Sequence, residues 1–152
     1  MAWNKDFSRL VSGSSNGSVF LWKPDLAKEK SLEGAGEAIY AVAIQPEGTL
    51  AAAGTWNGLV CIWNTATGKL LATLLSADRP DDQPLDWMLL TQSGYYACSP
   101  TMAERFRWQM SGQPLPADRV AESMNKPDQV IKILSGAEPA KIEFTAPPEN
   151  SP

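Results

Sequence analysis

Apolar residues between positions 42 and 64 fall into three short runs, and each run ends at a turn signal. The runs are 42–44, 50–53 and 59–62, separated by Pro46-Glu47-Gly48 and Asn57-Gly58. An Asn-Gly pair between apolar runs favours a type I′ hairpin turn, because both residues tolerate positive φ, and Pro fixes φ in the other turn. The pattern therefore predicts three short antiparallel strands, none of which is stable alone. The apolar residues expected to pack in this unit are Val42, Ile44, Leu50, Val60 and Ile62.

The same pattern occurs once more, in residues 3–23. Three pairs of residues share a spacing of 41: Gly13 and Gly54, Asn16 and Asn57, and Trp22 and Trp63. Three matches at one spacing, without a gap, indicate an internal repeat. A period of about 40–45 residues with several short strands in each repeat is typical of a propeller blade.

These units resemble the WD-repeat β-propeller family. The second strand of that repeat ends in Ser-Gly-Ser, matched here by Ser12-Gly13-Ser14 and Ala53-Gly54-Thr55, and its last strand ends in Trp-Asp, matched by Trp22-Lys23 and Trp63-Asn64. Gly36-Glu37 stands where the family has Gly-His, and the chain has no His. The hydrogen-bonded His–Ser/Thr–Asp–Trp network of many blades therefore cannot form, and we expect the blades to be held mainly by sheet packing.

Residues 85–109 resemble a third, divergent unit. Residues 85–90 match the inner strand, Thr91-Gln92-Ser93-Gly94 the first turn, and 95–98 and 105–108 the next two strands. This segment looks like the terminal blade of large bacterial WD-repeat proteins, some of which carry a caspase-like peptidase domain. That activity is not carried over, because a Cys-His peptidase needs a His base.

Two short helices are expected after this unit. Asp118 is placed to cap a helix over 119–124, and a second helix spans 128–134 and ends at Ser135-Gly136. Its apolar residues are expected to pack on the last blade and cover a sheet edge or bottom face, and the alternative is a helix that binds a partner. Pro-rich composition after residue 136 predicts a disordered or extended tail.

The predicted fold class is all-β, a partial β-propeller of about two and a half to three four-stranded antiparallel blades with a short C-terminal helical extension. Blades occupy residues 1–116, the extension 117–136 and a flexible tail 137–152. Within the first part, we expect an incomplete blade over 1–33, a second blade over 34–76 and the divergent last blade over 85–116. Because the chain begins inside a blade, we expect it to be a C-terminal fragment of a longer propeller with an open sheet edge.

Composition narrows the possible functions. A net charge of −4 and a pI near 4.8 argue against a nucleic-acid surface, which needs a basic patch. The sequence contains no stretch of membrane-span length and no signal-peptide core, so a cytoplasmic location is expected. Cys61 and Cys98 are predicted to be free buried thiols. Asp78, Asp81 and Asp82 lack the Gly and distal Glu of a calcium loop, so a solvated loop is favoured over a metal site.

The sequence favours a non-catalytic scaffold segment that mediates protein–protein interaction, without cofactor or metal. It has no His, no glycine-rich phosphate loop before a helix and no paired Cys spacing, and Ser12, Ser14 and Ser99 have no visible base. The expected partners are other proteins and the remaining blades of the parent propeller. Two alternatives stay open: a hydrolase-like propeller enzyme whose catalytic groups lie upstream, and a structural piece that completes a larger propeller.

The family resemblance also suggests where a partner docks. In that family, the loops between the second and third strands and the starts of the inner strands reach one face of the ring. Trp56 and Tyr40 occupy these places in the second blade, and Ser15 and Asp86 occupy matching places in the neighbouring blades. An exposed aromatic residue on a rigid scaffold is a frequent binding anchor. The alternative for Trp56 is that its side chain folds back and packs on an adjacent blade.

Overall fold

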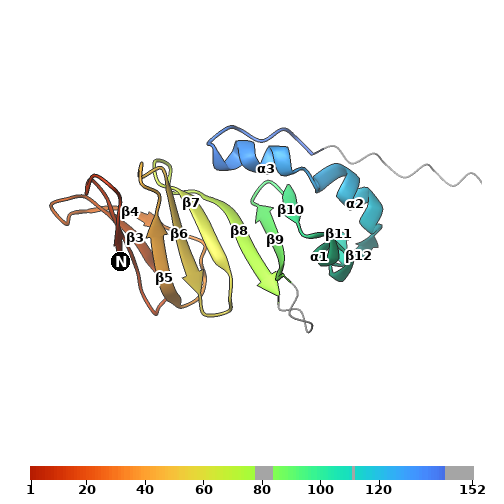
Figure 1. The fold of residues 1–152 in the computed structure, drawn as a ribbon, viewed down its shortest axis with the longest axis horizontal. Helices are drawn as coiled ribbons and strands as arrows, with labels where there is room; N and C mark the ends of the chain where they lie inside the picture. The colour runs from red at the N-terminus through yellow and green to blue at the C-terminus, as the bar shows by residue number, and fades with distance from the viewer. Residues whose placement is uncertain (78–83, 111, 143–152) are drawn as a thin grey trace, which may run out of the picture.

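The computed structural model describes residues 1–77, 84–110 and 112–142, so Asp78, Asp81, Asp82 and most of the predicted tail lie outside the described residues. The first blade is a four-stranded antiparallel sheet in the order β1-β2-β3-β4 (Figure 1). Its strands are β1 (Ala2–Trp3), β2 (Leu10–Gly13), β3 (Val19–Trp22) and β4 (Lys28–Leu32). Residues 2 and 3 therefore form the end of an inner strand, as the repeat predicts.

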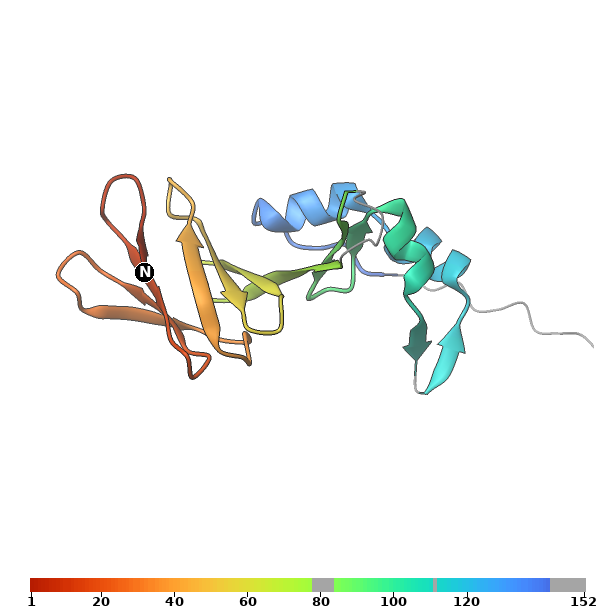
Figure 2. The ribbon, with the colours of Figure 1, turned by 60° about the horizontal axis from the view of Figure 1, so that its bottom comes forward.

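The second blade consists of the first four strands of a larger antiparallel sheet, whose order is β5-β6-β7-β8-β9-β10. Its strands are β5 (Ile39–Ile44), β6 (Leu50–Thr55), β7 (Val60–Asn64), β8 (Leu70–Ala77), β9 (Asp86–Thr91) and β10 (Tyr96–Cys98). The first blade stacks on the β5–β7 part of this sheet (Figure 2). These stacked antiparallel sheets, together with the short C-terminal helices, confirm the predicted fold class.

The divergent third unit differs from the expected blade. Strands β9 and β10 extend the second sheet beyond β8, and the strand predicted over 105–108 is wrong. Arg105 instead ends helix α1 (Pro100–Arg105), and Trp108 begins a separate hairpin of β11 (Trp108–Met110) and β12 (Gln113–Leu115). The cause is local: Pro100 stands where the other units have Asn-Gly, and Pro is favoured in the first helical turn.

The C-terminal helices are α2 (Ala117–Met124) and α3 (Pro127–Leu134). Helix α3 lies beside β8–β10 (Figure 1), where Val130 and Ile133 pack against Tyr95 and Ala97. This contact confirms that apolar helix residues cover part of the last sheet. Asp118 does not cap α2 as predicted: it lies inside the first turn, and the N-cap residue is Pro116. Helix α2 therefore begins two residues earlier than expected.

The main apolar cluster lies between the two blades. The first blade contributes Val11, Val19 and Leu32, and the second contributes Ala51, Ala53, Cys61 and Trp63. The five positions predicted to pack are all only half-buried: Val42, Ile44, Leu50, Val60 and Ile62. Val42 and Ile44 still contact this cluster, but the pairs Leu50–Asn64 and Gly54–Val60 show that Leu50 and Val60 belong to the opposite face of β6 and β7. The two-residue periodicity of a strand separates its side chains into two faces. The face with the larger side chains is not the one that packs against the other blade.

The repeated Trp residues use their indole N–H groups differently. In the first blade, Trp22 Nε1 donates to Ser12 Oγ at 2.8 Å, so one side-chain link of the family network is present without His. In the second blade, Ala53 stands at the place of Ser12, and Trp63 Nε1 donates to the Glu33 carbonyl at 2.7 Å. Sheet packing is therefore supplemented by one tryptophan hydrogen bond in each blade.

Both cysteines are free thiols, with Cys61 buried and Cys98 half-buried rather than buried. Burial raises the pKa of Cys61, with a Thr73 hydrogen bond acting in the opposite direction, and burial also raises the pKa of Cys98. Because the thiolate is the nucleophile, iodoacetamide should modify the folded protein at neutral pH far more slowly than the urea-unfolded chain. The rate should rise with pH, and Cys98 should react before Cys61. Mass spectrometry of quenched samples measures both rates, and equal rates in the folded and unfolded chains would refute the expectation.

Candidate functional site

The hairpin turn that carries Trp56 joins β6 to β7 and is held by its own residues. The Thr55 N–H donates to the Leu59 carbonyl at 2.9 Å, and the Gly58 N–H donates to the Thr55 carbonyl at 3.0 Å. Gly58 has φ of +80°, whereas Asn57 does not have positive φ. The predicted type I′ turn is therefore wrong: the loop 56–58 is the three-residue form, with a glycine in the left-handed region after a type I turn. This turn fixes the backbone on both sides of Trp56.

Tyr40 reaches the same place from strand β5. The pairing of β5 with β6 shifts between Ile39 and Ala41, so Tyr40 is the extra residue of a β-bulge. A bulge re-aims a side chain relative to the regular alternation of a strand. Next to it, the Trp56 N–H donates to the Ala38 carbonyl at 2.8 Å. The bulge and this hydrogen bond place the two aromatic side chains side by side.

Tyr40 and Trp56 form a contacting pair that faces solvent. Their ring centroids lie 5.6 Å apart with an angle of 30° between the planes, a separation at which aromatic side chains attract each other. Each side chain is nevertheless 70% exposed. Trp56 therefore does not pack on an adjacent blade, which was the alternative expectation. We call these two side chains the aromatic pair.

Ser15 lies at the same end of the blades as the aromatic pair. It is an exposed residue of the turn between β2 and β3, and the carbonyl of the preceding Ser14 accepts a 3.0 Å hydrogen bond from the Ile39 N–H. Because Ile39 precedes the Tyr40 bulge, this bond fixes the first-blade turn next to the start of β5. The structure thus brings three of the four predicted site residues to one surface.

Asp86 has different surroundings. It is only 3% exposed, and its carboxylate accepts hydrogen bonds from Ser99 and Thr101 and pairs with Arg105 at 3.2 Å. It lies on β9, four strand positions from β5 in the sheet, or about 19 Å at ordinary strand spacing. Asp86 therefore links β9 to α1 through hydrogen bonds and an ion pair, and it lies apart from the aromatic pair.

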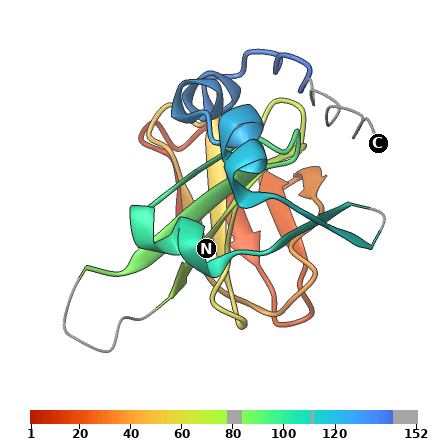
Figure 3. The ribbon, with the colours of Figure 1, turned by 90° about the vertical axis from the view of Figure 1, so that its right-hand side faces the viewer.

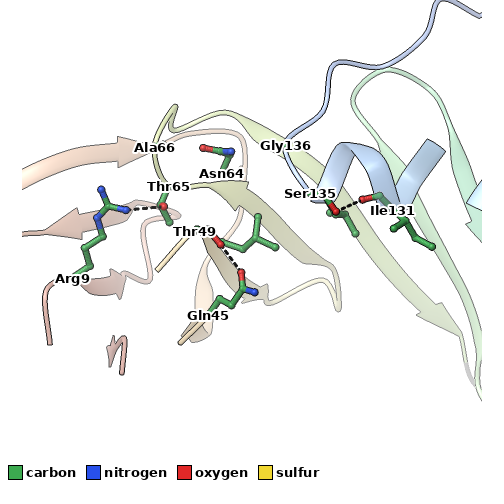
Figure 4. Close-up of a pocket in the computed structure, with 11 residues that line it drawn as sticks. Arg9, Gln45, Thr49, Asn64, Thr65, Ala66, Ile131, Ser135 and Gly136 are labelled. Atoms are coloured by element: carbon green, nitrogen blue, oxygen red, sulfur yellow. Dashed lines mark hydrogen bonds between the residues drawn. The ribbon is translucent and has the colours of Figure 1, made fainter. Parts of the chain in front are cut away.

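A cavity of about 460 Å³ lies at the other end of the blades, between the loop 64–66 and the end of α3 (Figure 4). Arg9 lines it, and its guanidinium donates to Thr65 Oγ1 at 3.2 Å and to the Gly48 carbonyl at 3.1 Å. The same side chain pairs with Glu29 at 3.3 Å. Arg9 thus ties the first blade to the second, and its donors are engaged within the protein.

The described part of the chain holds no group of three or more His, Cys, Asp or Glu side chains that could bind a metal. None of the helices among the described residues has the length and apolar character needed to cross a lipid bilayer.

The sequence identified Tyr40 and Trp56 but not their contact. Trp56 was found because it stands directly before an Asn-Gly turn, and Tyr40 because it starts an inner strand. The bulge at Tyr40 and the role of the Ala38 carbonyl left no sign in the residue types, since both are properties of the backbone. Arg9 was missed as a link between blades, and a cation near a strand end gives no specific signal for that role.

The first part of the chain is similar to known proteins. Residues 1–23 and 27–64, less than half of the chain, match the family model described as the WD domain, G-beta repeat. The Notchless protein homolog of Arabidopsis thaliana is 35% identical over 65 residues, which are 41% of this chain and 14% of that protein. The small ribosomal subunit protein RACK1y of Oryza sativa subsp. japonica is 38% identical over 66 residues, which are 43% of this chain and 20% of that protein.

The chain thus spans less than a quarter of the length of either relative. Among solved structures, it is similar to U3-55K with a TM-score of 0.46 and 18% identity, over 62% of this chain and 36% of that one. Both relatives are plant proteins, and the resemblance of residues 85–109 to bacterial terminal blades stays a prediction.

Proposed function

We propose that this WD40-repeat segment is a non-catalytic scaffold and that its aromatic pair anchors a protein partner. WD40 repeats generally act as protein-interaction scaffolds. One observation carries the proposal for this chain: Tyr40 and Trp56 are in contact with each other, and both are 70% exposed. Large aromatic side chains dominate the energy of protein interfaces when a partner buries them.

The backbone beneath the pair favours this role. Trp56 lies between hydrogen bonds at Thr55 and Gly58, and its own N–H is bonded to Ala38. A partner would therefore meet two side chains whose backbone positions are already fixed, which lowers the entropy cost of binding. Ser15 adds an exposed hydroxyl at the same end of the blades.

We further propose that these blades belong to a larger propeller and work in the cytoplasm. An isolated stack of two blades leaves apolar residues such as Val60 and Ile62 half-exposed, and repeat units bury such faces against neighbouring repeats.

The absence of His from the sequence supports a role without acid–base catalysis by imidazole. No observation favours the alternative hydrolase-like enzyme.

The aromatic pair is tested by selecting peptides from a displayed random library on the folded chain. Selected peptides should bind the Trp56→Ala variant about 30-fold more weakly, which corresponds to about 2 kcal/mol. Tyr40→Ala should also weaken binding. Fluorescence anisotropy with a labelled peptide measures the affinities, and a urea melt of each variant shows whether folding is intact.

Trp87→Ala is the matched control, because Trp87 is an exposed Trp on β9, away from the aromatic pair. It should leave peptide affinity unchanged. Unchanged binding by Trp56→Ala together with a large drop in its unfolding free energy would mean that Trp56 is a packing residue, and the proposed anchor would be rejected.

A further inference from the structure

The connection from β4 to β5 brings an acidic residue to the aromatic pair. Glu37 lies in this connection, directly before Ala38, whose carbonyl accepts the 2.8 Å hydrogen bond from the Trp56 N–H. On its other side is the first-blade turn: a Cβ atom at Gly17 would lie 3.1 Å from the Glu37 carbonyl oxygen. Contacts on both sides therefore hold the backbone of Glu37 between the first-blade turn and the aromatic pair.

The surface around the pair is acidic. The side chain of Glu37 is exposed, and its carboxylate has no hydrogen bond or ion pair with another described residue. The loops next to the pair are 14–18, 33–38 and 55–59, and they contain Glu33 and Glu37 but no Lys or Arg. The turns at the other end of the strands carry basic residues: Lys5, Arg9, Lys23 and Lys69.

The described part of the chain leaves the pair open. The loops around it come from the first and second blades, both of which the structure describes. Helix α3 ends beside Leu50 and Asn64, which are the first residue of β6 and the last of β7, whereas Trp56 follows the last residue of β6. The helix therefore lies at the opposite end of these strands from the aromatic pair (Figures 1 and 3).

The geometry of the pair suits a cation. A cation is attracted to the face of an aromatic ring when it lies within about 6 Å of the ring centroid, and Trp attracts it most strongly. The centroids of Tyr40 and Trp56 are 5.6 Å apart, so a single cation can lie within that range of both. The Glu37 carboxylate adds the attraction between opposite charges. A neutral side chain would gain nothing from that charge.

We propose that the aromatic pair and Glu37 together recognise a Lys or Arg side chain in a basic segment of the partner protein. The cationic group lies over the ring faces of the pair, and Glu37 accepts its N–H donors. This inference rests on the proposed function, because it names the partner's chemistry at the same site. A nucleic acid is the alternative occupant, since bases stack on exposed aromatic rings, but Glu33 and Glu37 repel its phosphates.

The experiment uses the peptides selected on the folded chain, which should be enriched in Lys and Arg. Each peptide is compared with copies in which one Lys or Arg is replaced by Gln. Replacing the residue that contacts the pair should weaken binding about 10-fold, because the cation–π contact and the ion pair are both lost. Fluorescence anisotropy measures the affinities. Raising NaCl from about 0.05 M to about 0.5 M should weaken the basic peptide several-fold but not this Gln copy, because salt screens exposed charges.

Glu37→Gln tests the carboxylate and should weaken the basic peptide about 3-fold, within the range of exposed ion pairs. Glu47→Gln is the matched control, because Glu47 is also exposed and lies in the β5–β6 turn at the other end of the strands. It should leave the affinity unchanged. The losses from Glu37→Gln and from the Gln copy of the peptide should not add, since both remove the same ion pair. A urea melt of Glu37→Gln should match that of the wild type.

Trp56→Leu tests the ring face, because it keeps an apolar side chain and removes the aromatic ring. It should weaken the basic peptide about 5-fold, in the range of cation–π contacts, and should weaken the Gln copy less. Equal losses for the two peptides would mean that Trp56 contributes only apolar contact, and the cation would then not lie on the pair.

Failure of this inference is distinct from failure of the proposed function. If the peptides need Trp56 but bind as well as their Gln copies, without response to salt or to Glu37→Gln, the partner site stands and a cationic partner is rejected. If Trp56→Ala leaves peptide binding unchanged, both proposals fail. Binding of a labelled oligouridylate that depends on Trp56 would also overturn the inference.

Discussion

Replacing Trp63 by Ala should lower the free energy of unfolding by about 3–5 kcal/mol, the range found for large aromatic residues in cores. Trp63 is fully buried and belongs to the apolar cluster between the blades. Its removal leaves a cavity and also leaves the Glu33 carbonyl without the indole N–H that reaches it at 2.7 Å. Urea unfolding followed by far-ultraviolet circular dichroism measures the change.

Trp56→Ala is the control for this prediction, since it is the same chemical change at a side chain that is 70% exposed. It should change the unfolding free energy by less than about 0.5 kcal/mol, as expected for a surface site. Similar losses for the two variants would mean that Trp63 is not central to the contact between the blades.

Gly13→Ala should destabilise the protein by about 2–3 kcal/mol, because the second blade packs directly on this position. A Cβ atom at residue 13 would lie 2.3 Å from Ile39 Cγ2 and 2.9 Å from Val42 Cγ1. Both side chains belong to β5, whose backbone is held in the second sheet. Overpacking of this kind costs about 1–3 kcal/mol, and relief would require the two blades to move apart. Thermal and urea melts measure the loss.

The repeat supplies a matched control at Gly54, which lies 41 residues after Gly13. A Cβ atom at residue 54 meets only Ala41 Cβ, at 3.8 Å, which is an ordinary contact. Gly54→Ala should therefore be neutral, or stabilising by up to about 1 kcal/mol through the lower entropy of the unfolded chain. Equal destabilisation by the two substitutions would contradict the stacking of the blades described here.

Much of the two-blade architecture could be predicted from the spacing of the turns and of the Trp residues. Asn16-Gly17 and Asn57-Gly58 bound neighbouring strands, and both turns occur where expected. The covered face of each strand could not be predicted, because alternation identifies two faces without saying which one meets the next blade. Small residues such as Ala51 and Ala53 are buried there, while the larger Val60 and Ile62 are half-exposed.

The third unit shows a different limit of the sequence. Its spacing of 45 residues from Trp63 to Trp108 suggested another strand at the second Trp, but spacing alone does not determine pairing. Pro100 begins a helix, and Trp108 lies in the separate β11–β12 hairpin. From there its ring stacks on that of Tyr96, with 5.1 Å between the ring centroids. Residues 85–109 resemble a blade in the spacing of their residues. Their structure follows instead from the helix that Pro100 begins and from the contact between Trp108 and Tyr96.

The candidate site was predicted in the same incomplete way. Trp56 and Tyr40 were found from their places in the repeat, and both are exposed as binding residues must be. Asp86 was chosen by the same rule and is buried beside Ser99 and Arg105, because β9 extends the second sheet and does not begin a new blade. A rule based on the repeat applies only where the repeat itself is kept.

Hydrogen exchange with and without a selected peptide tests most directly whether the aromatic pair is the partner site. Binding should slow exchange at the amides of Ile39, Trp56 and Gly58, which lie beneath the pair, and leave the amides of Ser99 and Met102 near α1 unchanged. Protection confined to α1 or α3, with Trp56 and Gly58 exchanging as in the free protein, would contradict the account.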